Sequence, residues 1–113
     1  MEQLERQLGA WASGSTGTEA AVELLIETGY WLRRVEFVDQ AITVGESQAS
    51  IDWVTASTLA SQLQCSRGER FVLLLACSLA DPEQTVAMSD IAALDGRNVA
   101  HVLEALRTAK FGW

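Results

Sequence analysis

"LQCSRGERFVLLLACSLAD", residues 63–81, is the stretch that decides the fold. Ser66 and Glu69 have the spacing S-x-x-E, which is typical of a capping box: the hydroxyl accepts an N–H of the first helical turn and the carboxylate reaches back to the cap residue. The helix that follows, about residues 67–80, is apolar on nearly every side from Phe71 onward. A helix that is hydrophobic all round is buried. Since it is far shorter than the roughly 20 residues needed to cross a bilayer, the pattern predicts the central core helix of a globular domain.

The same stretch has the form of the signature segment of an ATP-binding-cassette ATPase. Such a segment acts beside a phosphate-binding loop of the form G-x-x-x-x-G-K-[ST], whose lysine reaches the phosphates. The chain has a single lysine, Lys110, and it is followed by Phe111 and Gly112. The sequence therefore excludes this nucleotide site, and we expect no cofactor.

Length and composition indicate one domain over residues 1–113. The hydrophobic content of 49% and the single proline argue against disorder. The two cysteines, Cys65 and Cys77, do not form a C-x-x-C motif, and there is one histidine, so neither a disulfide framework nor a zinc site is supported. The first residues lack the basic and apolar regions of a signal peptide. We expect a cytoplasmic protein with no bound metal and no membrane segment.

The acidic charge is concentrated in the first half of the chain. Residues 1–64 hold nine acidic and three basic side chains, residues 65–113 hold six and five, and the formal net charge is −7. Such a field repels phosphate backbones and favours basic partners.

Helical periodicity extends on both sides of the central helix. Caps, glycines and apolar spacing predict further helices over 2–12, from a cap at Thr16 to about residue 28, over 30–43 and 53–63, from a cap at Ser89 to residue 94, and over 96–109. Residues 13–18 read as a flexible Gly/Ser linker, which makes 1–12 an N-terminal arm, and Thr16 with Glu19 repeats the capping pattern. A polar loop is expected over 45–50, and one short strand over 85–88. The fold class is therefore all-α: a compact single-domain bundle of about six to seven helices around the central helix.

The same spacing predicts which side chains face the core. They are Trp31, Leu32, Val35, Val38 and Ile42 in the third helix, Leu59 and Leu63 in the fourth, and Val99, Val102, Leu103 and Leu106 in the last. The tryptophans fall one per segment, so we expect most in the core and no cluster, with Trp113 exposed.

No pattern of catalytic residues stands out. His101 is the only histidine; it has no serine or cysteine at a recognisable motif spacing, and G-x-S-x-G is absent. Cys65 precedes a helix N-terminus, where a reactive thiol is the alternative to a simple spacer before the cap. We expect no enzyme.

The final third of the chain resembles a winged helix-turn-helix domain in the order of its elements. A helix over 67–80 and a break over 81–88 precede a short helix with the sequence SDIAAL, a turn at Asp95-Gly96 and a longer helix in RNVAHVLEALRTAKFGW, residues 97–113. In that family the last helix enters the major groove and a β-hairpin wing follows. Here no wing follows, and Asp95 stands where an apolar residue is usual.

This resemblance implies DNA contacts from the last helix, through Arg97, His101, Arg107 and Lys110. Glu104 lies among them and the net charge is −7. DNA binding by a helix-turn-helix regulator is therefore the alternative function, beside a scaffold of the same form used for protein contacts.

Two longer stretches, TEAAVELLIETGYWLRRVEFV (18–38) and CSRGERFVLLLACSLA…LDGRNVAHVLEAL (65–80 and 94–106), resemble short uncharacterised helical proteins of actinobacteria and their mobile elements. The shared residues are mainly core and capping positions. The resemblance implies a helical fold and no particular activity.

Two features suggest a partner surface. Glu19, Glu23 and Glu27 lie at i, i+4 and i+8 on one helix face, with no basic residue beside them on that helix. They are expected either to form a solvated face or to meet a basic surface on a partner protein. The second feature is the stripe Leu4, Leu8 and Trp11, which docks on its own domain, on a second copy in a homodimer, or on a partner. The predicted function is thus protein binding by a small acidic regulator, adaptor or inhibitor.

Overall fold

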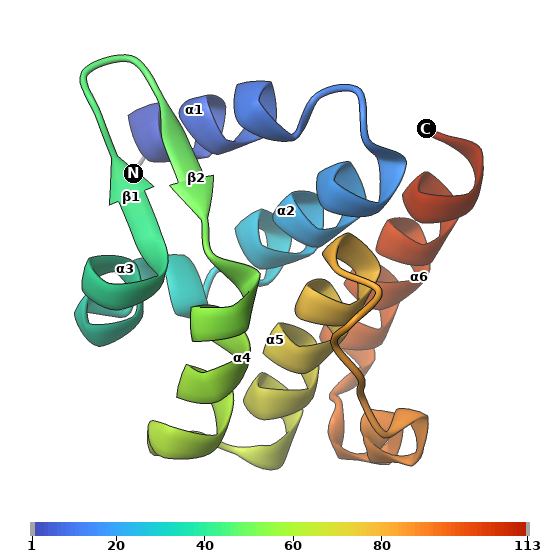
Figure 1. The fold of residues 1–113 in the computed structure, drawn as a ribbon. Helices are drawn as coiled ribbons and strands as arrows, with labels where there is room; N and C mark the ends of the chain where they lie inside the picture. Colours follow the sequence, from blue (N-terminus) through green and yellow to red (C-terminus); the bar gives the residue numbers. More distant parts are fainter. Residues whose placement is uncertain (1, 113) are drawn as a thin grey trace.

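Six α-helices, two short 3-10 helices and one β-hairpin make up residues 2–112, the part of the chain that the structure, a computed structural model, describes (Figure 1). The elements are α1 (Glu2–Ala12), α2 (Thr16–Thr28), η1 (Trp31–Arg33), α3 (Val35–Ala41), β1 (Ile42–Val44), β2 (Ala49–Ile51), α4 (Trp53–Gln62), α5 (Arg67–Ala80), η2 (Met88–Ala93) and α6 (Gly96–Phe111). The predicted compact helical bundle is confirmed, with the hairpin as an addition. Trp113, expected to be exposed, lies outside the described residues.

The core forms where α2 meets its neighbours. α2 packs most extensively against α6 and α5 and also contacts α1, and α4 covers α5. In α5 six residues are buried: Phe71, Val72, Leu73, Leu75, Ala76 and Cys77. The predicted central helix is therefore a buried helix, and α2 shares the centre with it.

Three helix starts follow the residues that the sequence singles out. The capping box of α5 is complete: the Ser66 hydroxyl accepts the Glu69 N–H at 3.1 Å, and the Glu69 carboxylate accepts the Ser66 N–H at 2.9 Å. Asp52 caps α4 by accepting the N–H of Val54 and of Thr55, and Asp95 caps α6 by accepting the N–H of Asn98. The N–H of Thr55, donated to the carboxylate of Asp52, lowers the pKa of that group. These caps fix where the helices begin.

The predicted third helix, residues 30–43, is wrong. Arg34 has an extended backbone with ψ 114°, which ends η1 and starts α3 in a new phase. As a result Val35, expected in the core, is 67% exposed, while Phe37 is fully buried. The segment also ends early, because the β-branched run Ile42–Val44 forms a strand.

A β-hairpin encloses the predicted polar loop: residues 45–48 are its loop, as predicted, and residues 49 and 50 belong to β2. β1 and β2 pair antiparallel with Ile42 opposite Ile51 and Val44 opposite Ala49. Ile42 and Ile51 are both buried and Ala49 joins them, so the hairpin closes one side of the core. α1 packs across β2, above the body of the bundle in Figure 1.

The linker before α2 is shorter than expected. α2 starts at Thr16 with Ser15 as its N-cap, so only residues 13–15 connect α1 to α2. Thr16 forms no capping box with Glu19; the Glu19 carboxylate instead accepts the N–H of Gly14 at 3.0 Å. A three-residue connection holds α1 close to α2.

The C-terminal third departs from the prediction in three places. Residues 85–88 form no strand, and η2 is a 3-10 helix that begins at Met88 with no side-chain cap from Ser89. On α6, Val102 is buried and Leu106 packs against the core, as predicted, but Leu103 is 59% exposed, and Ala105 and Thr108 are buried in its place. The small residues Ala105 and Thr108 allow α6 to pack closely on α2. The spacing of large apolar side chains does not reveal such positions.

Gly17 and Gly9 are expected to respond oppositely to substitution by alanine. A Cβ on Gly17 would overlap the backbone carbonyl oxygen of Leu79, where α2 meets α5, whereas a Cβ on Gly9 meets nothing within 4 Å. Gly17→Ala should lower the free energy of unfolding by roughly 1–3 kcal/mol through overpacking. Gly9→Ala should raise it by up to about 1 kcal/mol, because alanine is the better helix former. Urea unfolding followed by circular dichroism measures both, and a stabilised Gly17→Ala would contradict the α2–α5 packing.

Candidate functional site

The row Glu19, Glu23 and Glu27 lies on α2, between α1 and α6. Glu27 is exposed, and the other two are half-buried. Glu23 accepts a hydrogen bond from the hydroxyl of Thr108 on α6 at 2.8 Å, and Glu19 accepts the Gly14 N–H. Two of the three carboxylates therefore also hold neighbouring elements, whereas Glu27 makes no such bond within residues 2–112.

A groove between α1 and α2 runs beside this row. One hollow of about 200 Å³ is lined by Gly9, Ala12, Glu19, Val22, Glu23, Ile26 and Glu27. A second, of about 390 Å³, is lined by Glu2, Glu5, Arg6 and Ile26. Ile26 borders both, so the two form one surface: an apolar floor of Val22, Ile26 and Ala12 edged by five carboxylates and one guanidinium. We call this surface the acidic groove.

The apolar stripe of α1 docks on its own domain. Leu8 is fully buried and Leu4 packs against the core. Trp11 is 39% exposed and stacks on Trp53 of α4, with ring centroids 6.2 Å apart. The expectation that no tryptophans cluster is wrong for this pair. The stripe is used within the chain, and its neighbours Glu2, Glu5 and Arg6 remain to line the acidic groove.

The residues considered for DNA contact lie on α6 but do not form a continuous basic face. Arg97, Arg107 and Lys110 are exposed, and His101 is half-buried. Arg107 is engaged in an ion pair with Glu104 on the same helix.

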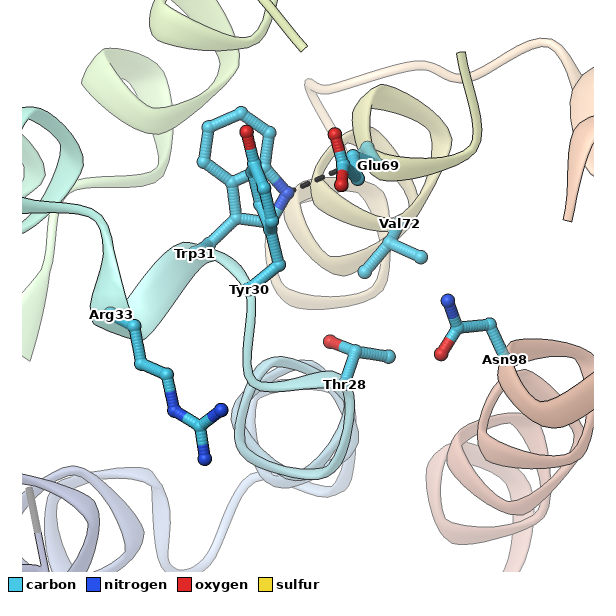
Figure 2. Close-up of a pocket in the computed structure, with 7 residues that line it drawn as sticks. All are labelled: Thr28, Tyr30, Trp31, Arg33, Glu69, Val72 and Asn98. Atoms are coloured by element: carbon cyan, nitrogen blue, oxygen red, sulfur yellow. Dashed lines mark hydrogen bonds between the residues drawn. The ribbon is translucent and has the colours of Figure 1, made fainter. Parts of the chain in front are cut away.

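A separate pocket of about 310 Å³ lies where the end of α2, η1, α5 and α6 meet (Figure 2). Its walls are Thr28, Tyr30, Trp31, Arg33, Glu69, Val72 and Asn98. The indole N–H of Trp31 donates to the carbonyl of Glu69 at 2.8 Å, so the ring is fixed. The sequence did not reveal this pocket, because its polar residues come from four elements with no shared motif.

The candidate nucleophile, Cys65, and the candidate base, His101, have no catalytic partner among residues 2–112. His101 makes no hydrogen bond in that range, and both cysteines are free thiols. Burial, followed by the charge of Asp81, raises the pKa of Cys77 to about 12.

The two thiols should therefore differ in reactivity. At pH 8 a disulfide reagent such as dithiobis(nitrobenzoate) is expected to label half-buried Cys65 in the folded protein and to leave Cys77 unlabelled, because the thiolate of Cys77 is not populated and its sulfur is covered. Denaturation should release the second equivalent. Rapid labelling of both thiols in the folded chain would contradict the buried position of Cys77.

Within residues 2–112, no group of three or more His, Cys, Asp or Glu side chains is placed to hold a metal ion. The described helices all fall short of the length and apolar character that a bilayer-spanning segment needs. Comparison with protein-family models, with curated proteins and with solved structures finds no match to this chain.

Proposed function

We propose that this protein acts by binding a basic segment of another protein in the acidic groove, as a small regulator, adaptor or inhibitor in the cytoplasm, and that it is not an enzyme. The observation that carries this proposal is the meeting of an apolar floor with a rim of five glutamates in one surface between α1 and α2. The two unpaired cysteines agree with a reducing compartment.

The groove suits a lysine- or arginine-rich amphipathic helix. A third helix laid between two others buries its apolar face in the groove between them. The long apolar stems of lysine and arginine can cover half-buried Ile26 while their charged ends reach the glutamates. Charge complementarity of this kind speeds association and selects the partner more than it raises affinity.

The groove is also held in shape before any partner arrives. The bond from Thr108 to Glu23 ties α6 to α2, and the bond from Gly14 to Glu19 fixes the connection to α1. Buried Leu8 anchors α1 itself. A preformed site loses little conformational freedom on binding, which favours affinity.

A labelled peptide tests the proposal. The probe is an amphipathic helix of about four turns made of leucine and lysine, and its counterpart carries glutamate in place of lysine. We expect saturable binding of the lysine peptide by fluorescence anisotropy, weakening as salt rises from about 0.02 to 0.3 M because exposed charges are screened, and no binding of the glutamate peptide. Equal binding of both peptides, or of neither, would contradict the proposal.

DNA binding by α6 stays the alternative. It is favoured by the exposure of Arg97 and Lys110 at the two ends of α6 and opposed by the ion pair of Arg107 with Glu104. A reader of DNA would show affinity that falls steeply with salt, because each phosphate contact releases counterions.

A further inference from the structure

We infer that the pocket in Figure 2 binds a small organic carboxylate with an apolar body, independently of the acidic groove. Its volume of about 310 Å³ is at the lower end of the range for small-molecule sites. At about 30 Å³ per water-sized group, it holds roughly ten non-hydrogen atoms.

Arg33 supplies the charge that selects a carboxylate. Its guanidinium has no hydrogen-bond or ion-pair partner among residues 2–112, although acidic residues outnumber basic ones in the chain, 15 to 8. The neighbouring Arg34, in contrast, is bonded to Tyr30, to Glu36 and to the carbonyl of Gln64. The planar guanidinium offers paired donors that match the two oxygens of a carboxylate.

The geometry around Arg33 places this charge at the pocket. A Cβ built on Gly29 would lie 3.7 Å from the Arg33 guanidinium carbon, so the side chain lies across the end of α2. Figure 2 shows Arg33 and Asn98 on opposite sides of Thr28: the Asn98 amide points toward the pocket, and the Arg33 side chain extends beside the end of α2. The side-chain amide of Asn98 also has no hydrogen-bond partner within residues 2–112, so it can bond a polar substituent of the ligand.

The remaining walls suit an apolar body. The surface for this body is the ring of half-buried Tyr30, which meets the Trp31 ring edge-on with centroids 5.0 Å apart. Trp31, whose N–H is bonded to the Glu69 carbonyl, and Val72 are themselves buried and support this wall. The one acid at the pocket is Glu69. Its carboxylate accepts the Ser66 N–H at the start of α5, where the positive end of the helix dipole offsets its charge.

Benzoate is a suitable probe, and benzamide, of the same shape without the charge, is its control. With the full chain labelled with ¹⁵N and ionic strength held constant, we expect saturable shifts of the Trp31 indole and Asn98 amide signals with benzoate. Benzamide should bind at least about tenfold more weakly, since it lacks the charge that Arg33 recognises. Arg33→Gln should lose benzoate binding, whereas Arg67→Gln, at an exposed arginine that pairs with Asp90 and lines neither this pocket nor the acidic groove, should keep it. Absence of saturable shifts, equal binding of benzamide, unchanged binding by Arg33→Gln, or equal loss with Arg67→Gln would overturn the inference.

Discussion

Replacing Trp31 by alanine is expected to lower the free energy of unfolding by about 3–5 kcal/mol, a large part of the roughly 5–15 kcal/mol that stabilises a typical domain. Trp31 is fully buried, its ring lies 5.5 Å from that of Phe37, and its indole N–H satisfies the Glu69 carbonyl at the first turn of α5. Alanine leaves a cavity and removes this additional hydrogen bond to the Glu69 carbonyl, which lies within the hydrogen-bond ladder of α5. Chemical denaturation followed by circular dichroism measures the loss.

Two further variants separate these contributions. Trp31→Phe keeps most of the ring but removes the hydrogen bond, so it should cost less than the alanine variant, about 1–3 kcal/mol. Trp11→Ala is the control for tryptophan removal in general, because Trp11 is 39% exposed; we expect roughly 1–2 kcal/mol. If Trp11→Ala were as damaging as Trp31→Ala, the position of Trp31 at the centre of the core would be wrong.

Reversing the charge of Glu5 and Glu27 together should weaken binding of the basic peptide roughly 10- to 30-fold at low salt, since two attractive contacts become repulsive. These two line opposite sides of the acidic groove, one on α1 and one on α2, and neither makes a hydrogen bond within residues 2–112. Glu23→Lys is a poor test, because Glu23 also holds Thr108 of α6. The helical content should stay unchanged.

The matched control is Asp39→Lys with Glu46→Lys. Both residues are exposed and lie outside the groove, and the double variant has the same net charge as the Glu5 and Glu27 reversal. Its affinity for the peptide should stay within about threefold of that of the wild type, because salt screens charges that lie far from the bound peptide. Similar weakening in both double variants would mean that the peptide responds to overall charge and that the groove is only a solvated surface.

Local sequence signals predicted the parts of the fold that local interactions control. Ser66 and Glu69 start α5, Gly29, with φ 77°, ends α2, and Asp95 starts α6, because each acts on backbone groups within a few residues of itself. The break at Arg34 has no such signal: the residue bonds Tyr30 and the distant carbonyl of Gln64, so its conformation is set by packing.

The candidate sites illustrate the same limit. The spacing of four between Glu19, Glu23 and Glu27 is visible in the sequence. That Glu5 lines the same groove depends on how α1 packs against α2. The bond between Glu23 and Thr108 joins residues 85 positions apart. The pocket around Arg33 needs four separate elements to meet. No periodicity within one segment encodes such contacts.

The most direct test of the central claim, that a basic partner segment docks in the acidic groove, is to map the bound peptide on the protein by nuclear magnetic resonance. In ¹⁵N-labelled protein titrated with the lysine peptide, the largest amide shifts should fall on α1 and α2, at Gly9, Val22, Ile26 and Glu27, which line the groove. Largest shifts on the outer face of α6, or shifts of equal size over the whole surface, would contradict the account.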